Sequence, residues 1–102
     1  NEKGNQNAWL QIDLVGTSSN RFAIGASVTI KAGPLLVFRE VKGSEGFGST
    51  DPYRLHFGLG QQQKIDSIQV SWPSGKKQVF RDLEPNQRIE INESSDVWQN
   101  AK

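Results

Sequence analysis

Few side chains in this chain could do chemistry. It holds one histidine, His56, and neither cysteine nor methionine. A disulfide, a thiolate zinc site and a cysteine nucleophile are therefore excluded. A Ser-His-Asp triad could form only through His56, and the Gly-x-Ser-x-Gly motif that would present its serine is missing. We therefore expect this chain not to be an enzyme.

Four residues are candidates for binding. His56 and Arg54 fall on the polar side of one predicted strand, where an imidazole beside a guanidinium could hold an anionic group. An ordinary pair of surface residues is the alternative interpretation. Exposed aromatic rings also recognise sugars and peptides, because a flat ring gives contact area at low entropic cost. Trp9, opposite the inward face of its strand, and Phe47, isolated on a glycine-rich loop, are the aromatic candidates.

The sequence holds no compact motif for a metal or a phosphate group. No two aspartates lie within four residues of each other, so the EF-hand spacing is absent. A calcium site assembled from separate loops stays open. The segments Gly46-Phe47-Gly48 and Gly58-Leu59-Gly60 complete neither a GxGxxG nor a Walker pattern, and such glycines fit bulges and strand ends. We therefore expect no cofactor.

The length and the net charge of the chain exclude further classes of partner. The 102 residues suit one domain, and the chain begins at Asn1, so we expect a piece of a longer protein. Twelve Lys and Arg against eleven Asp and Glu give a net charge of +1. The basic residues are scattered among acids, and no stretch approaches the ~20 apolar residues that span a bilayer. We expect neither nucleic-acid binding nor membrane insertion.

β-Strands must position these side chains, because apolar and polar residues alternate along much of the sequence. Leu10, Ile12 and Leu14 alternate with polar neighbours, which is typical of a half-buried strand. Seven short segments are strand-like: 9–14, 26–32, 35–38, 53–57, 68–72, 78–81 and 88–92. They predict an all-β fold of about seven short, mainly antiparallel strands in a β-sandwich, with a small β-barrel as the alternative. Segment 35–38 is apolar on both faces, which predicts a central or doubly covered strand.

Turn residues indicate where strands are joined into hairpins, and the polar ends of the chain indicate the limits of the domain. Gly33-Pro34 and Trp72-Pro73-Ser74-Gly75 predict two hairpins, and Trp72 shares the apolar face of its strand, which predicts a core position. We assign 1–6 to a polar leader or linker, 7–93 to the β domain and 94–102 to a polar tail. Trp98, within that tail, is expected to dock on the domain.

Three motifs in a fixed order carry a family resemblance. They are SNRFAIGASV at 19–28, LHFGLG at 55–60 and VSWPSG at 70–75, preceded by NAWL at 7–10 and followed by INE at 91–93. Together they resemble the ASPIC/UnbV module over roughly residues 7–93. That module is found at the C-terminus of cartilage acidic protein-like secreted proteins and of UnbV-type proteins from enediyne gene clusters. A common form of the first motif has glycine where Ala23 stands here.

The resemblance implies which domains usually neighbour this module, and it implies no particular reaction. Such modules usually follow a β-propeller of FG-GAP or VCBS repeats in exported or surface proteins, where the propeller binds the calcium. No enzymatic activity is established for the family, so the resemblance adds no catalytic residue. The motif residues suit turns, strand ends and a hairpin, which implies an architectural role for Asn20, Gly25, Gly58, Gly60, Pro73 and Gly75.

We therefore expect a non-enzymatic accessory or binding module of a larger exported protein, located outside the cell, in the periplasm or on the cell surface. It would pack on or work beside a β-propeller, and it could bind an extracellular protein or a glycan. The first alternative is a carbohydrate-binding module that uses Trp9, Phe47, Arg54 and His56. The second is an accessory subunit in small-molecule biosynthesis, which would need a deep pocket at His56 with carboxylate neighbours.

Overall fold

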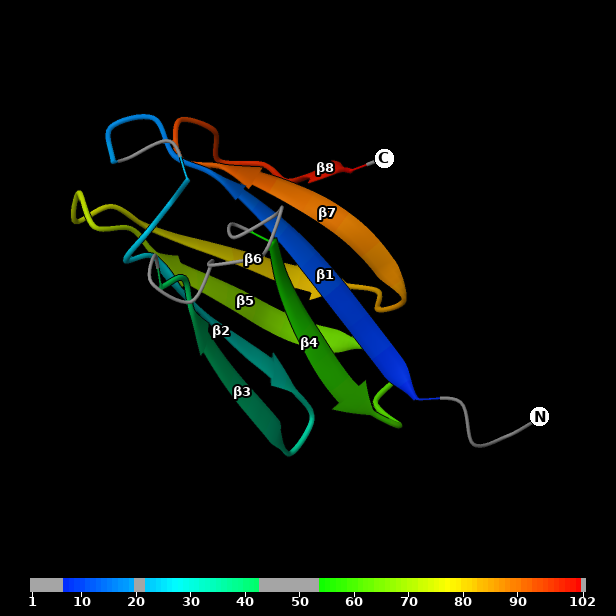
Figure 1. The fold of residues 1–102 in the computed structure, drawn as a ribbon. Coiled ribbons are helices and arrows are strands. Elements are labelled where there is room, and N and C mark those ends of the chain that lie inside the picture. Colours follow the sequence, from blue (N-terminus) through cyan, green and yellow to red (C-terminus); the bar gives the residue numbers. More distant parts are fainter. Residues whose placement is uncertain (1–6, 20–21, 43–53, 102) are drawn as a thin grey trace.

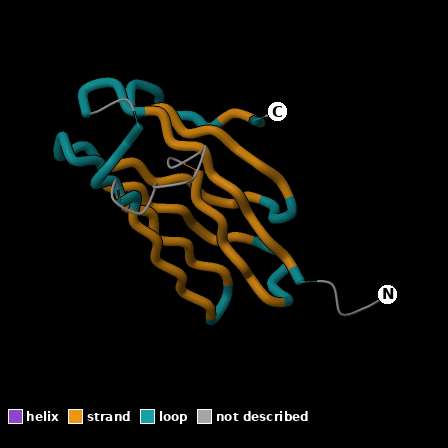
Figure 2. Tube along the Cα trace, in the orientation of Figure 1, coloured by secondary structure: helices purple, strands orange, loops and turns teal. Residues whose placement is uncertain are grey.

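The computed structural model describes residues 7–19, 22–42 and 54–101. The candidates Asn20 and Phe47 lie outside these ranges. Within them, all regular secondary structure consists of strands (Figure 2). Their bounds are β1 Ala8–Val15, β2 Ser27–Ala32, β3 Leu35–Glu40, β4 Arg54–Gly60, β5 Ile65–Ser71, β6 Lys77–Leu83, β7 Gln87–Asn92 and β8 Gln99–Asn100. No helix in the part of the chain that the structure describes is long and apolar enough to cross a membrane.

The strands form two sheets that pack face to face (Figure 1). The first sheet has the order β4-β1-β7-β8 and the second has the order β3-β2-β5-β6. Every pairing is antiparallel except that of β1 with β7, which run side by side in the same direction. The prediction of an all-β sandwich is confirmed. The described strands do not close into the alternative barrel.

The core lies between the sheets, where the alternating residues meet. Leu10, Ile12 and Leu14 of β1 are fully buried and belong to the same cluster as Ile30 of β2 and Ile68 of β5. Burying one such side chain stabilises the fold by about 1.5–3 kcal/mol. Trp72 is also buried there, as its place on the apolar face of its strand predicts.

The prediction of a covered strand at 35–38 is wrong. β3 pairs with β2 alone and forms one edge of the second sheet. Leu35 and Val37 pack against the core, whereas Leu36 is 69% exposed and Phe38 is 56% exposed. An apolar residue on the outer face gives the same sequence pattern whether that face is covered or open, so the pattern alone could not place this strand.

Part of the predicted polar tail adds a strand to the first sheet. β8 lies within residues 94–102 and pairs antiparallel with β7, with Ile89 opposite Asn100. The Ala101 backbone N–H also donates to the Arg88 carbonyl at 2.9 Å. Trp98, just before β8, packs against the core, as predicted.

The connections gather at the two ends of the sandwich (Figure 1). One end, here the cleft end, holds the start of β1, the β4–β5 loop and the β6–β7 turn. The other, here the motif end, holds the loop after β1, the β5–β6 hairpin and the segment after β7. The two ends bring together different sets of polar side chains.

Candidate functional site

The motif end is built around a buried carboxylate. Glu93 continues the inward alternation of Ile89 and Ile91 beyond the end of β7, and it is 2% exposed. Its Oε1 accepts hydrogen bonds from the backbone N–H groups of Thr17 and Ser19, both at 2.8 Å. These bonds fix the loop that follows β1.

The second oxygen of this carboxylate reaches the β5–β6 hairpin. Glu93 Oε2 accepts hydrogen bonds from Ser19 Oγ, at 2.9 Å, and from Ser74 Oγ. Ser74 in turn donates its backbone N–H to Ser19 Oγ at 3.1 Å. One carboxylate therefore joins three segments that are far apart in the sequence. We call Thr17, Ser19, Ser74 and Glu93 the Glu93 cluster.

These bonds determine the charge of the carboxylate. Burial alone raises the pKa of Glu93. The hydrogen bond from Ser74 and those from Ser19 and Thr17 outweigh burial and lower the pKa to about 2, from the ordinary value of 4.5. Glu93 is therefore ionised at neutral pH. Because each oxygen already accepts two hydrogen bonds, we assign the carboxylate a structural role.

Gln78, a buried polar residue, extends the same network. Its Oε1 accepts the Trp72 indole N–H at 2.7 Å, and its Nε2 donates to the Ser95 carbonyl at 2.6 Å. Lys76 Nζ donates to the Glu93 carbonyl at 2.7 Å. The hairpin and the segment after β7 are thus tied together through both side chains and backbone.

The turn before β2 has little steric freedom. Gly25 has φ +96°, and a Cβ added there would lie 3.2 Å from Pro73 Cγ. Ala23 also has a positive φ, of 60°, and its carbonyl accepts the Ala26 N–H at 2.9 Å. Positive φ favours glycine, so the glycine that the resemblance gives as a common form of the motif at this position would fit the turn.

At the cleft end, the outer face of the first sheet presents two rings. Trp9 and His56 are nearly parallel, with 8° between their planes and 6.4 Å between their centres. Gln11 Nε2 lies 3.2 Å from His56 Nδ1, within hydrogen-bond distance. Gly58 is directly opposite Trp9 on β4, and a Cβ built on it would meet no atom within 4 Å. We call Trp9, Gln11, His56 and Gly58 the platform; with Asn7 and Ala8 they line a shallow hollow of about 370 Å³.

Arg54 lies on the same face and belongs to an ion pair. Its Nε is 2.7 Å from Asp13 Oδ1, and its terminal nitrogen donates to Asp13 Oδ2 at 3.3 Å. Asp13 is buried although it points to the outer face. Such a two-point contact fixes the guanidinium against the sheet. Arg54 therefore pairs with Asp13, and the contact with His56 that the sequence suggested does not form.

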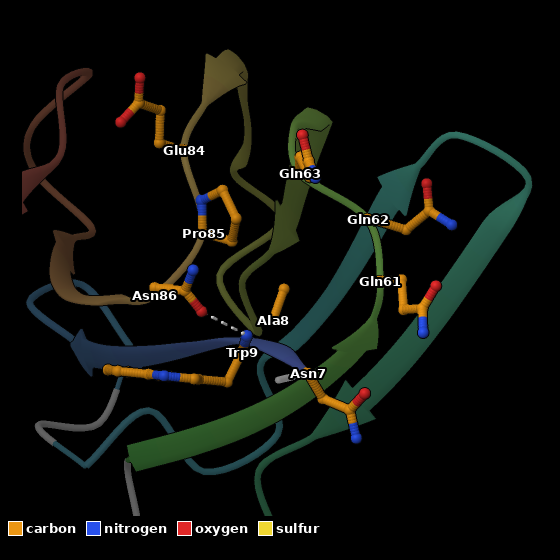
Figure 3. A pocket seen from close by; sticks show the side chains of 9 residues that line it. All are labelled: Asn7, Ala8, Trp9, Gln61, Gln62, Gln63, Glu84, Pro85 and Asn86. Carbon is orange, nitrogen blue, oxygen red and sulfur yellow. Dashed lines mark hydrogen bonds between the residues drawn. The ribbon is translucent and has the colours of Figure 1, made fainter. Parts of the chain in front are cut away.

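A second, larger hollow of about 810 Å³ adjoins the platform at the very end of the sandwich. Side-chain amides dominate its lining, which comprises Asn7, Ala8, Trp9, Gln61, Gln62, Gln63, Glu84, Pro85 and Asn86. Figure 3 shows the three glutamines along the loop after β4, with Glu84, Pro85 and Asn86 opposite them and the start of β1 between. We call this hollow the amide cleft.

One wall of the amide cleft is fixed by a reciprocal backbone contact. Asn86 has φ +66°, and its Oδ1 accepts the Trp9 backbone N–H at 3.1 Å. The Asn86 backbone N–H donates to the Trp9 carbonyl at 2.5 Å. The indole of Trp9 takes no part in either bond, and Figure 3 shows it on the other side of the β1 ribbon from Asn86.

Comparison with known proteins identifies the family. Residues 16–97 match the family model described as ASPIC and UnbV. The chain belongs to this family. A search of curated proteins and a search of solved structures each give no match. The resemblance that the motifs predict is thereby confirmed.

The ASPIC/UnbV motifs meet mainly at one end of the sandwich. Ser19 and Gly25 of the first motif lie against Ser74 and Pro73 of the third, and Glu93 of the closing motif joins them. The second motif forms most of β4: Gly58 lies inside the strand, and Gly60, with φ +61°, is its last residue. Gly75 has φ +99° and closes the hairpin with a bond to the Trp72 carbonyl.

Sequence reasoning placed Trp9 and His56 among the candidates, and the structure brings them together. It missed the role of Glu93, although an acid two residues after Ile91 continues an inward alternation. It also missed the amide cleft, for which three consecutive glutamines at 61–63 were the available signal. Within the described residues, no group of three or more His, Cys, Asp or Glu side chains could hold a metal ion.

Proposed function

We propose that this ASPIC/UnbV domain is a non-enzymatic accessory module of a larger exported protein and that it packs on a neighbouring β-propeller. The observation that carries the proposal is the exposure of Leu36 and Phe38 on the outer face of β3. These two apolar side chains stand at alternate positions on an edge strand, where they would be buried by a partner. Exposed apolar groups of this kind mark interaction surfaces.

The rest of the second sheet supports this face as the contact. In the register of the strands, Phe38 is level with Thr29 of β2, Gln69 of β5 and Val79 of β6. The row thus begins and ends on exposed apolar residues and has uncharged polar residues between them. A face of this mixed character suits an interface between domains of one chain, which is more polar than an obligate one.

The surroundings of His56 support a non-enzymatic role. His56 is exposed, and the described residues that line its shallow hollow include no carboxylate and no serine. A hydrolytic mechanism would need a nucleophile and a group that orients the imidazole. The biosynthetic alternative therefore gains no support from this geometry.

The complete reading frame is the first test. It should encode an export signal and propeller repeats on the same polypeptide as this domain; a frame with neither would overturn the proposal. The propeller and this domain, produced as separate chains, should then associate in a calorimetric titration. Changing Leu36 and Phe38 together to serine should weaken association at least tenfold. Val97→Ser, at an exposed apolar residue just before β8 and outside the second sheet, is the control, and an equal loss there would contradict docking through the outer face of the second sheet.

A further inference from the structure

We propose that the platform and the amide cleft form one binding site for a neutral glycan chain. This inference does not rest on docking to a propeller, because it uses the first sheet and the cleft end, whereas docking uses the outer face of the second sheet. The two hollows share Asn7, Ala8 and Trp9, so a ligand that lies on one can continue into the other.

The platform supplies the apolar contact. The nearly parallel rings of Trp9 and His56 offer flat surfaces against which the C–H face of a sugar ring can pack. Gly58 leaves the position opposite Trp9 without a side chain, in open space. Any larger residue there would stand beside the indole on the same face of the sheet. Access to Trp9 therefore depends on this glycine.

The amide cleft supplies the polar contacts. A side-chain amide has two donor hydrogens and an acceptor oxygen, and a sugar hydroxyl is likewise both donor and acceptor. Four residues with such amides, Asn7, Gln61, Gln62 and Gln63, line one hollow. Within the described part of the chain, none of these four side chains has a hydrogen bond that would compete with a ligand. Several amides of this kind match a ligand with many hydroxyls.

The charges favour a neutral glycan over an acidic one. Among the described residues that line the two hollows there is no lysine and no arginine, and Glu84 is the one carboxylate. A sulfated or uronic-acid polymer would need cations to offset its charge. The nearest guanidinium on β4, that of Arg54, is engaged with Asp13. An anionic chain would therefore meet no lysine or arginine among the described lining residues.

A proline-rich peptide is the competing ligand, because such segments also dock on aromatic residues. The number of side-chain amides in the cleft favours a glycan over a proline-rich peptide. A proline-rich chain has few backbone donors to offer, so most of the glutamine carbonyl groups would lose water without a replacement. A glycan can satisfy both the donor and the acceptor of each amide.

Affinity electrophoresis of the whole chain tests the proposal. The gels would contain hydroxyethylcellulose, xylan, amylopectin or galactomannan, with alginate and heparin as anionic polymers and polyproline as the peptide probe. We expect retardation by at least one neutral polymer, little changed by 0.5 M salt (about 0.5 M suffices, because the Debye length is then well below 10 Å). Trp9→Ala and Gly58→Leu should each weaken the retardation at least tenfold.

Gly58→Leu is the sharper variant, because it adds a side chain in open space on a strand and removes no contact. Phe38→Ala, which removes an exposed aromatic ring from the other sheet, is the matched control and should bind normally. Changing Gln61 and Gln63 together to alanine should weaken binding several-fold; no change would contradict a site that includes the cleft. Retardation by no neutral polymer, by anionic polymers or polyproline alone, or to the same extent in Gly58→Leu would overturn the proposal.

Discussion

At the motif end of the sandwich, each oxygen of the buried Glu93 carboxylate accepts two hydrogen bonds from neighbouring loops. At the cleft end, three consecutive glutamines line a hollow of about 810 Å³, and no hydrogen bond to the described residues holds their side-chain amides. Both ends are polar, but polar groups that are fully bonded inside a protein fix its structure. Polar groups left open to solvent remain available to a ligand.

The same contrast appears in the glycines. Gly25 at the motif end and Gly60 at the cleft end both have positive φ, but an added Cβ would press on Pro73 at the first position and meet nothing within 4 Å at the second. The family match covers the whole Glu93 cluster and also residues 56–63 and 84–86 of the cleft end, whereas Trp9 and Gln11 precede it. We therefore assign architecture to the motif end and recognition to the cleft end, and each prediction below tests that assignment.

The largest effect is expected for Glu93→Ala. This change would leave the part-buried backbone N–H groups of Thr17 and Ser19 without their acceptor, at up to about 1–3 kcal/mol for each group. We expect the free energy of unfolding to fall by about 3 kcal/mol or more, as measured by urea denaturation. Glu40→Gln, at an exposed carboxylate on β3, is the control and should change stability by less than about 0.5 kcal/mol. Equal effects would remove the distinction between this carboxylate and a surface one.

Acid should weaken the fold through the same group. The pKa of Glu93 is about 2 in the folded chain and 4.5 as an ordinary value, so the unfolded chain binds the proton more readily. The stability that Glu93 contributes is therefore present above pH 4.5 and is lost as the pH falls from about 4.5 toward 2. Urea denaturation at a series of pH values should show this loss in the natural chain. Glu93→Gln, which cannot ionise, should flatten that part of the profile; an unchanged profile would contradict the assignment.

A pair of glycine substitutions compares the two ends directly. Gly60→Ala adds a side chain in a left-handed conformation with free space around it, which costs about 1 kcal/mol. Gly25→Ala has φ +96° and also a tight contact of 3.2 Å with Pro73 Cγ, so we expect a loss of about 2 kcal/mol. In thermal unfolding, the melting temperature of Gly25→Ala should be lower than that of Gly60→Ala. The reverse order would show that the motif end adapts more easily than its contacts suggest.

The smallest effect on stability is expected at the amide cleft. Gln61→Ala and Gln63→Ala remove exposed side chains that have no hydrogen bond within the described residues, so the free energy of unfolding should change by less than about 0.5 kcal/mol. Chemical denaturation of each variant measures this. A loss above about 1 kcal/mol would mean that the glutamines support the fold.

Much of the fold could be predicted because strand alternation is local. The period of two placed Leu10, Ile12 and Leu14 in the core, and turn residues placed the hairpin at Pro73 and Gly75. The parallel pairing of β1 with β7 could not be predicted, because strand order depends on contacts between distant segments. Exposed Leu36 and Phe38 misled the prediction for β3 for the same reason.

The candidate site was predictable only in part. An aromatic residue and a histidine on polar strand faces can be picked from the sequence, but their meeting depends on the register that sets Trp9 opposite Gly58 and Gln11 opposite His56. The ion pair of Arg54 with Asp13 follows from that register too. The amide cleft needs the β4–β5 loop and the β6–β7 turn to lie at one end, which is a property of the topology.

Nuclear magnetic resonance titration tests the division between the two ends most directly. An amide-labelled sample of the chain would be titrated with a soluble neutral oligosaccharide, cut from the polymer that retards it in the gel. We predict shifts confined to the residues that line the platform and the amide cleft, with the Thr17 and Ser19 amides unmoved. Shifts centred on the Glu93 cluster, or no shift at any concentration of the oligosaccharide, would contradict the assignment of recognition to the cleft end.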